Sequence, residues 1–483
     1  MLLMKINFTL HQSLYFALGI VIMKSVSMIM LPIVTRYLPP ATFGELELLL
    51  SISNFVTLLM GFGLVNALYR FAGLGIADEK DIGRTVFTLA TISGSVVLLL
   101  SLLLAPLLQT YWGSNISLFD LQLVIVLFSV EGCIAIPLAW LKMKEDALSF
   151  FLLTTSKALL QALLTWILLR EGYGITAVLL AGVTSSLLLV VLLLRIQIKA
   201  TGLGLNWQLL PQILRYGLPL TISALAAFAV LGADRWVINL VSSTEQLGLY
   251  AVGKKLATIS VMLMQPFVLW WYPRRFKMLK EDRGNARVAH TTSFGIALVI
   301  CCSTMICLAS PLLFGTLIDL SYASAMQYVP ALTLLYMIKQ TAELANLGSY
   351  IGRSTWNVTL IDVCTALISV SCFYFLSERF KVPGVIAALI IAQCFRVTLF
   401  YIISQRALYL NYEKASLFGL LLISGALVFI SMQLNEFVHH QLMVWISAGL
   451  LIGYLHFSKL FTLSHLRKNS QIAQESHHEK III

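Results

Sequence analysis

Residues 174–194 read GITAVLLAGVTSSLLLVVLLL, a run of 21 residues without a charged side chain. Arg170 and Glu171 precede this run, and Arg195 follows it directly. An α-helix needs about 20 mostly apolar residues to cross the hydrocarbon core of a bilayer, which is roughly 30 Å thick. The stretch therefore predicts a transmembrane helix with charged residues at both ends.

The composition of the whole chain agrees with this local signal. Of the 483 residues, 59% are hydrophobic and 11% are charged, and the mean hydropathy is +0.88. Soluble domains carry about 45–50% apolar and roughly 25% charged residues, so a soluble enzyme is excluded. A transmembrane β-barrel is excluded as well, because its strands alternate polar and apolar residues. We therefore predict an all-α polytopic membrane protein.

Windows of about 20 apolar residues predict fourteen spans. The first is an uncleaved span and not a signal peptide, because it leads directly into further membrane segments. The predicted spans are 12–34, 43–66, 85–108, 118–140, 148–169, 174–194, 216–240, 247–271, 291–316, 326–350, 356–377, 383–405, 415–433 and 438–458.

The distribution of basic residues predicts the orientation of these spans. If the N-terminus is cytoplasmic, 22 of the 33 Lys and Arg residues fall in cytoplasmic segments and 6 fall within spans. The remaining five fall on the outer side: Arg36, Arg170, Arg235, Arg379 and Lys381. Cytoplasmic loops are enriched in Lys and Arg, so both termini are predicted to be cytoplasmic.

Two span–loop–span units resemble each other. Val34–Gly44 (VTRYLPPATFG) and Ile238–Gly248 (INLVSSTEQLG) each leave one span and enter the next, and Gly44 and Gly248 are 204 residues apart. Parallel repeats of this kind are a transporter architecture with the substrate site between the halves. We predict two six-helix lobes around a central cavity, 1–200 and 201–410, followed by two additional spans in 411–460 and a cytoplasmic tail in 461–483.

Several motifs carry a family resemblance that extends over about residues 12–405. They are Pro32–Gly44 (PIVTRYLPPATFG), Gly61–Phe71 (GFGLVNALYRF), Tyr216–Pro219 (YGLP), Ala233–Ile238 (ADRWVI) and Leu247–Leu256 (LGLYAVGKKL). In these stretches the chain resembles the Wzx-type O-antigen and polysaccharide flippases of the multidrug/oligosaccharidyl-lipid/polysaccharide (MOP) exporter superfamily.

The resemblance implies a non-enzymatic flippase of the bacterial inner membrane that works by alternating access. The implied substrate is an undecaprenyl-diphosphate-linked oligosaccharide, moved from the cytoplasmic to the outer leaflet during O-antigen, lipopolysaccharide or other polysaccharide biosynthesis. The expected partners are this substrate, membrane lipids, and the polysaccharide polymerase and chain-length proteins. No cofactor and no nucleic acid are expected.

Ionised side chains inside the spans are the candidate site residues, because each costs about 2.5–3.5 kcal/mol at the bilayer centre on insertion scales. Lys24 lies near the middle of the first span and has no acid within a helical turn. Its stem is too short to reach water across half the bilayer. We therefore predict that Lys24 binds the substrate diphosphate; an ion pair with another helix is the alternative. The resemblance supports this role, since related flippases carry cavity bases on the first span.

The other predicted diphosphate-binding cations are Lys254, Lys255, Lys339, Arg396 and Arg70. Lys254 and Lys255 diverge by about 100° around a helix, so one of them is expected to face the cavity. Arg396 could bind phosphate in a bidentate manner, with Asp362 as its alternative structural partner. Arg70 ends the second span and matches the family's Arg there, although the positive-inside rule also accounts for it.

Three acids are predicted to act in coupling or gating: Glu343, Asp234 and Asp362. Glu343 lies four residues after Lys339, so the two can pair on one helix face or exchange protons or ions. Asp234 is expected to pair locally with Arg235. We interpret Lys157 and Glu131, on neighbouring spans, as a structural ion pair.

Two alternative functions compete with the flippase. A membrane glycosyltransferase or polymerase would need acidic or large outer loops, and the predicted outer loops are short. A cation-coupled drug exporter of the same superfamily would favour an acidic or aromatic cavity, whereas six bases outnumber the acids within these spans. The sequence contains no metal-ligand spacing of Cys or His residues and no Walker loop.

Overall fold

The computed structural model describes residues 2–61, 63–73, 75, 78–112, 116–350, 356–433, 437–458 and 460. Within these residues the secondary structure is helical, with no strand. The predicted tail, 461–483, lies outside the described residues. The all-α polytopic prediction is thus confirmed for the described chain.

Each of the first six predicted spans coincides with a helix or a helix pair. The helices are α1 (Leu2–Tyr37), α2 (Pro40–Gly61), α3 (Leu64–Gly73), α4 (Glu79–Trp112), α5 (Leu118–Met143), α6 (Ala147–Arg170) and α7 (Ile175–Thr201). The second span, predicted as one helix over 43–66, is broken between α2 and α3, where Gly63 adopts a positive φ of 62°. Glycine adopts this backbone conformation without the steric cost of a side chain.

The remaining predicted spans also have helical counterparts. These helices are α8 (Leu210–Leu231), α9 (Asp234–Val241), α10 (Thr244–Met278), α11 (Gly284–Thr316), α12 (Val329–Ala345), α13 (Trp356–Ala407), α14 (Lys414–Ser431) and α15 (Phe437–Phe457). The 3₁₀-helices η1 (Leu320–Tyr328) and η2 (Leu347–Tyr350) flank α12. The predicted seventh span is divided into α8 and α9. Ten helices of the described chain are long and apolar enough to cross a membrane.

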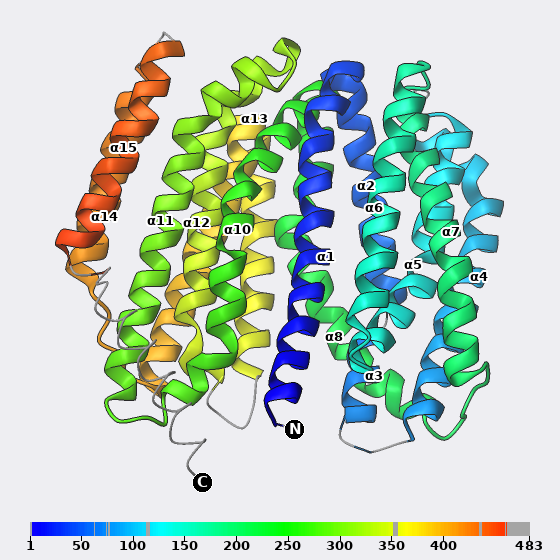
Figure 1. Ribbon diagram of the computed structural model, residues 1–483. Coiled ribbons are helices and arrows are strands. Elements are labelled where there is room, and N and C mark those ends of the chain that lie inside the picture. Colours follow the sequence, from blue (N-terminus) through cyan, green and yellow to red (C-terminus); the bar gives the residue numbers. More distant parts are fainter. Residues whose placement is uncertain are drawn as a thin grey trace. The chain divides into compact units, whose positions relative to one another are not determined.

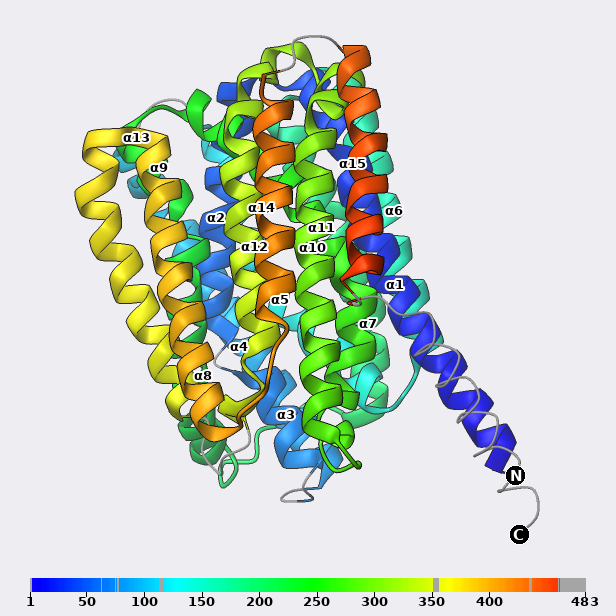
Figure 2. The same ribbon diagram turned by 90° about the vertical axis from the view of Figure 1, so that its left-hand side faces the viewer.

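The label α13 covers two of the predicted spans. Lys381 has non-helical dihedrals (φ 53°, ψ −130°), so the helix is interrupted there. A Cβ on Gly384 would lie 2.7 Å from the carbonyl carbon of Leu376, which shows how closely the chain folds back on itself. Figure 2 shows the two arms of α13 joined at this turn. The prediction of separate spans at 356–377 and 383–405 is therefore confirmed.

Packing divides the chain into two compact units. The first comprises Met1–Val252, Leu317–Ser324 and Asp362–Leu389; the second comprises Gly253–Thr316, Ala325–Ile361 and Ile390–Ile483. The lobe boundaries predicted from the sequence repeat remain a prediction.

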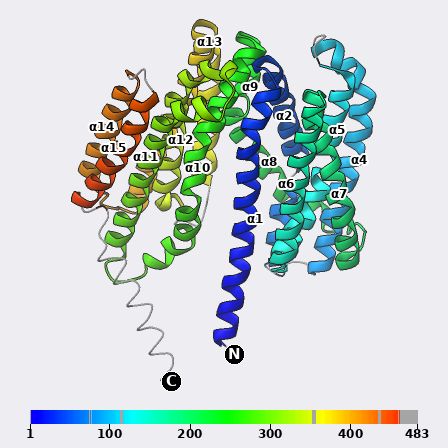
Figure 3. The same cartoon turned by 45° about the horizontal axis from the view of Figure 1, so that its top comes forward.

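In the first unit, α5 is the central helix and contacts α2, α3, α4, α6 and α7, while α6 lies between α1 and α7 (Figure 1). Its interior is apolar, with Leu68, Ile82, Phe87 and Trp140 buried together. In the second unit, α11 contacts α12, α14 and α15, and Figure 3 shows α14 and α15 side by side next to α11. Trp271, Ile300 and Leu420 are buried in its core.

Candidate functional site

The N-terminal ends of α2 and α10 contact each other through two glycines, Gly44 and Gly248. Both glycines belong to the first unit. A Cβ on Gly44 would lie 2.8 Å from the carbonyl carbon of Thr244 and closer still to its oxygen. A Cβ on Gly248 would lie 2.8 Å from the carbonyl carbon of Pro40 and closer still to its oxygen. We call these four residues the glycine junction. Only glycine lets the two backbones approach this closely.

The glycine junction has the symmetry expected of the sequence repeat. Each glycine contacts the residue four positions before the other glycine, and both Pro40–Thr244 and Gly44–Gly248 are separated by 204 residues. A reciprocal contact between equivalent residues is what a two-fold relation between two copies produces. The aligned glycines thus meet at the point where the two repeats contact each other.

A buried charge network lies beside the glycine junction. Arg235 Nε donates to Glu47 Oε2 at 3.1 Å, and Arg235 Nη1 lies 3.9 Å from Asp234 Oδ1. Tyr250 Oη donates to Asp234 Oδ2. Asp234 and Tyr250 are 0% exposed and Glu47 is 3% exposed. The expected Asp234–Arg235 pair is present, and it is extended by Glu47 from α2.

Glu47 was not among the predicted site residues. The available signal was that Glu47 lies in the second span and that Arg235 is one of only five bases on the predicted outer side. An isolated base on that side requires a partner, and α2 supplies one because it packs against α9.

Two further hydrogen bonds hold the same region together. Ser51 Oγ, on α2, donates to the carbonyl oxygen of Gly232 at 3.1 Å. Tyr322 Oη donates to the carbonyl oxygen of Leu38 at 2.7 Å, and the Tyr322 ring meets Phe43 edge-on. These contacts join segments that lie far apart in the sequence, so this part of the first unit is closely packed.

Gly44→Ala and Gly248→Ala are each expected to lower the melting temperature of the purified protein and to reduce transport. The added methyl group overlaps a backbone carbonyl, and overpacking of this kind typically costs about 1–3 kcal/mol. Gly449→Ala is the matched control, because nothing lies within 4 Å of a Cβ there. A Gly44→Ala protein with the melting temperature of the wild type would contradict the close contact.

Lys24 lies at a similar height to Lys157 on the neighbouring helix. A Cβ on Gly19 of α1 would lie 3.6 Å from Phe151 Cα and 3.5 Å from Thr154 Oγ1 of α6, and the Tyr15 and Phe151 rings are 5.9 Å apart. Lys24 is five residues beyond Gly19. Lys157 is three residues beyond Thr154 and six beyond Phe151. At 1.5 Å per residue, both lysines are roughly 4.5–9 Å above this contact, because α1 and α6 run in the same direction.

The predicted Lys157–Glu131 ion pair is not formed. α5 places Glu131 beside residues of α2, α3 and α4, in a small cavity that includes Thr57 and Ser93. Lys157 instead lies on α6, which packs against α1 and α7. Lys24, Lys157 and Glu131 are all half-buried, and within the described chain none of them forms a hydrogen bond or an ion pair. The two lysines thus lack a carboxylate partner there.

Arg70, at the end of α3, contacts the start of α8. Its guanidinium carbon lies 4.5 Å from the centre of the Tyr216 ring, and Phe71 meets the same ring edge-on. Arg70 is exposed. A cation–π contact leaves the N–H donors of the guanidinium available for other ligands. Tyr216 is part of the quoted YGLP motif but was not predicted to contact Arg70.

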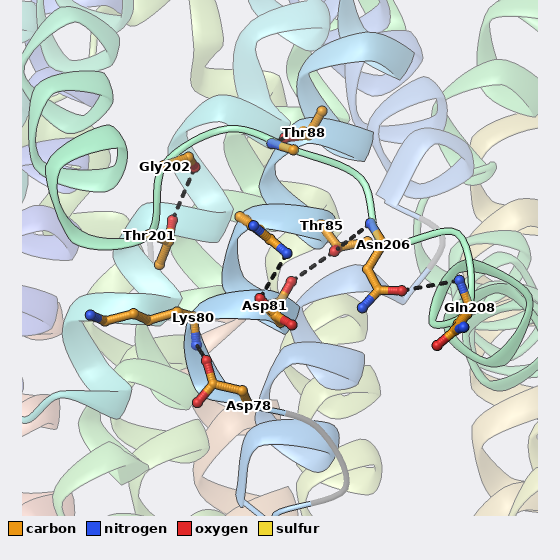
Figure 4. A network of polar contacts seen from close by, with 11 residues as sticks. Asp78, Lys80, Asp81, Thr85, Thr88, Thr201, Gly202, Asn206 and Gln208 are labelled. Atoms are coloured by element: carbon orange, nitrogen blue, oxygen red, sulfur yellow. Dashed lines mark hydrogen bonds and ion pairs between the residues drawn. The ribbon is translucent and has the colours of Figure 1, made fainter.

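The connection between α7 and α8 is fixed to the start of α4. Gly204 N donates to Thr88 Oγ1 at 3.0 Å and Asn206 N donates to Thr85 Oγ1 at 3.2 Å. Thr85 in turn donates to the carbonyl oxygen of Asp81. Figure 4 shows this segment arching over the two α4 threonines. The predicted lobe boundary at 200/201 falls at the end of α7, a few residues before this hydrogen-bonded segment.

The second unit holds Lys254 and Lys255 on α10. Lys254 is 6% exposed, whereas Lys255 is partly exposed. The two neighbours thus differ in burial, as their divergence around the helix predicts. That one of them faces the cavity and meets the substrate remains a prediction.

The other predicted residues are all half-buried. Lys339 and Glu343 lie on α12, and they form no ion pair with each other in the part of the chain that the structure describes. The guanidinium of Arg396 lies 5.0 Å from the centre of the Phe400 ring, one turn further along α13. Asp362 lies on the other arm of α13. The structure does not assign these residues a role, so their site assignments remain predictions.

Arg275 is a buried cation that the sequence did not single out. It is 7% exposed, and its guanidinium carbon lies 4.3 Å from the centre of the Tyr272 ring and 5.6 Å from that of Tyr350. Arg275 Nη1 donates to Asn346 Oδ1 at 3.3 Å. Beyond the end of the span at Tyr272, burial lowers the pKa of the Arg275 guanidinium. In the sequence Arg275 is one of several basic residues in the polar segment 272–290, between the predicted eighth and ninth spans.

Among the described residues, no group of three or more His, Cys, Asp or Glu side chains is arranged to hold a metal ion.

Comparison with known proteins identifies one family and several solved structures with a similar fold. A family model described as "Polysaccharide biosynthesis protein" matches residues 33–312. The lipid II flippase MurJ in an inward closed conformation is similar in structure, with a TM-score of 0.69 at 11% sequence identity, over 94% of this chain and 100% of that one. An inward-facing multidrug resistance MATE family transporter of the MOP superfamily has a TM-score of 0.60 at 13% identity, over 79% of this chain and 94% of that one. No curated protein sequence matches the chain.

Proposed function

The chain belongs to the polysaccharide biosynthesis protein family, and on this premise we propose that it moves an undecaprenyl-diphosphate-linked oligosaccharide from the cytoplasmic to the outer leaflet. It is a multi-pass membrane protein with the fold of MurJ and of the MATE transporters. In the proposal it works by alternating access in the bacterial inner membrane, with both termini cytoplasmic. The oligosaccharide is a precursor of O antigen or of another polysaccharide.

The observation that carries the proposal is the position of Lys24 and Lys157. They lie at similar heights on adjacent helices, half-buried, with no carboxylate partner in the described chain. Each ionised lysine is costly inside a membrane unless an opposite charge or water compensates it. A diphosphate group brings the negative charge that two such lysines can bind. An anionic lipid-linked substrate therefore explains both residues together.

The remaining predicted cations belong to the same proposal. Arg70 meets the diphosphate at the cytoplasmic end of α3, and Lys254, Lys255, Lys339 and Arg396 contribute positive charge along the path. Glu343, Asp234 and Asp362 act in coupling or gating. The glycine junction and the Glu47–Arg235–Asp234 network lie at the predicted outer ends of the spans, where they join α2 to α9 and α10.

A second candidate function is export of cationic drugs. It is favoured by the structural likeness to MATE transporters. The two functions require opposite charges in the substrate, so the intramembrane lysines favour the diphosphate lipid. An enzyme that acts on lipid-linked sugars is the other alternative function. In our proposal the polysaccharide polymerase and the chain-length proteins are partners of the flippase.

The test is a binding and transport assay with the purified protein in proteoliposomes. Undecaprenyl-diphosphate-linked oligosaccharide should bind at least about tenfold more tightly than a neutral glycolipid with the same sugar, since one charge-assisted contact contributes about 1.5–3 kcal/mol. Added salt should reduce the preference for the diphosphate lipid over the neutral glycolipid to the extent that the charged contact is exposed to water. Equal affinity for both lipids would refute the proposal, and selective transport of a cationic drug would establish the alternative.

A further inference from the structure

The break between α2 and α3 lies beside an acid in the middle of α5. α2 ends at Gly61 and α3 begins at Leu64, within one predicted span. A cavity of about 60 Å³ lies at this break, and its lining includes Thr57 and Gly61 of α2, Ser93 of α4 and Glu131 of α5. All of these residues belong to the first unit. The cavity thus places one carboxyl group next to the end of an interrupted helix.

Glycine contacts between α4 and α5 place Glu131 next to Ser93. A Cβ on Gly94 would overlap the carbonyl oxygen of Ser129, with 3.5 Å to its carbonyl carbon, and a Cβ on Gly132 would lie 3.2 Å from Ala90 Cβ. Gly94 directly follows Ser93 in the sequence, and Gly132 directly follows Glu131. The short distance between the helices therefore brings the hydroxyl and the carboxyl to the wall of one small cavity.

The Glu131 carboxylate needs compensation that the described protein atoms do not give. It makes no hydrogen bond or ion pair within the described residues, and among the residues that line the cavity it is the one titratable group. A charged side chain at this depth is costly without a counter-charge. The cavity beside the carboxylate has room for a few water-sized spheres of about 10–15 Å³ each, which suits a small ion.

The cavity offers the ligands of a small cation. Thr57 and Ser93 have hydroxyl oxygens; Ser93 donates its proton to the carbonyl oxygen of Ala90 at 3.0 Å, so its lone pairs remain for a cation. The last four carbonyl groups of a helix have no partner within the helix, and the C-terminal end of the helix dipole is negative. α2 presents that end at Gly61. Interrupted helices provide cation sites in transporters for this reason.

We propose that Glu131, Thr57, Ser93 and the carbonyl end of α2 bind one sodium ion. One carboxylate balances one positive charge, which favours a monovalent over a divalent ion. Hard cations prefer oxygen ligands, and the polar groups of this cavity are oxygens. The inference goes beyond the proposed function, because sodium binding is measured with no lipid-linked sugar present. Failure of one proposal therefore leaves the other intact.

The test measures the melting temperature of the purified full-length protein in detergent while sodium chloride replaces choline chloride at constant ionic strength and pH. A ligand that binds the folded state raises the melting temperature with increasing concentration. The wild type should show a saturable rise of a few degrees, and Glu131→Gln should show none. Glu171→Gln, at an exposed position after α6, is the matched control and should respond like the wild type.

Ser93→Ala provides a second variant in case Glu131→Gln fails to fold. It keeps the carboxylate and removes one oxygen ligand, so half-saturation should need several-fold more sodium. A Glu131→Gln protein that responds to sodium like the wild type would overturn the proposal. The proposal would also be overturned if sodium did not change the melting temperature of the wild type, while pH changed it in the wild type and not in Glu131→Gln. Glu131 would then bind a proton and no metal ion.

Discussion

Lys24→Ala is expected to reduce export of the lipid-linked oligosaccharide about 10- to 100-fold at normal protein abundance. The loss corresponds to one charge-assisted contact of about 1.5–3 kcal/mol with the diphosphate. Lys24→Arg should retain part of the activity, because the charge is kept and the geometry changes. The assay follows accumulation of lipid-linked oligosaccharide on the cytoplasmic face, normalised to the amount of protein in the membrane.

Lys157→Ala should lower export in the same way, although the sequence assigned this lysine to a pair with Glu131. Adding Glu131→Ala should not restore the activity, since the two residues form no ion pair. Two lysines that bind one diphosphate should show non-additive losses in a double-mutant cycle. Lys199→Ala, at the exposed end of α7, is the control. Full export by Lys24→Ala at normal abundance would remove Lys24 from the site and transfer its role to Lys254, Lys255 or Arg396.

The second large effect concerns stability. Arg235→Ala should lower the melting temperature strongly and reduce the amount of folded protein, because it removes the guanidinium from beside the buried Glu47 and Asp234 carboxylates. Removing one partner of a buried ion pair typically costs about 3–5 kcal/mol. Arg235→Lys should lose less, since it keeps the charge without the fork-shaped donor set.

Adding Glu47→Gln to Arg235→Ala should recover part of the stability, because the amide carries no charge that needs a cation. Melting temperature and yield of monodisperse protein in detergent are the measurements. Glu171→Gln combined with Arg235→Ala controls for the general effect of removing a negative charge. If Arg235→Ala melts at the temperature of the wild type, the charge network makes no net contribution to the fold.

Much of the fold could be predicted from local properties of the sequence. A span needs about 20 apolar residues, and this requirement is met segment by segment without knowledge of any neighbour. The predicted fourteen spans therefore coincide with helices, including the two arms of α13. The interruptions at Gly63 and at Gly232–Ala233 were not predicted. The residues before and after each break are exposed to lipid and therefore apolar, so the hydropathy of the sequence does not change where the helix is broken.

For the candidate site too, the charged residues could be predicted from the sequence and their contacts could not. Sequence was sufficient to find the intramembrane lysines, because an ionised residue within an apolar run is conspicuous wherever it lies. It was not sufficient to find their neighbours. Lys157 and Glu131 are close in the order of spans, but the rotation of α5 and α6 directs them to different helices. Glu47 and Arg235, 188 residues apart, form the ion pair that no local pattern indicates.

The class of the protein, the positions of its long apolar helices and the offset of its internal repeat could be predicted from the sequence alone. These follow from the cost of exposing polar backbone and charge to lipid, which each segment bears alone. Three contacts became visible when the helices were packed together: Gly44 meets Gly248, Glu47 binds Arg235, and Glu131 lies near the end of α2. Those contacts depend on which faces of the helices pack together, and the uniformly apolar surface of a membrane helix leaves its rotation unspecified until its neighbours are in place.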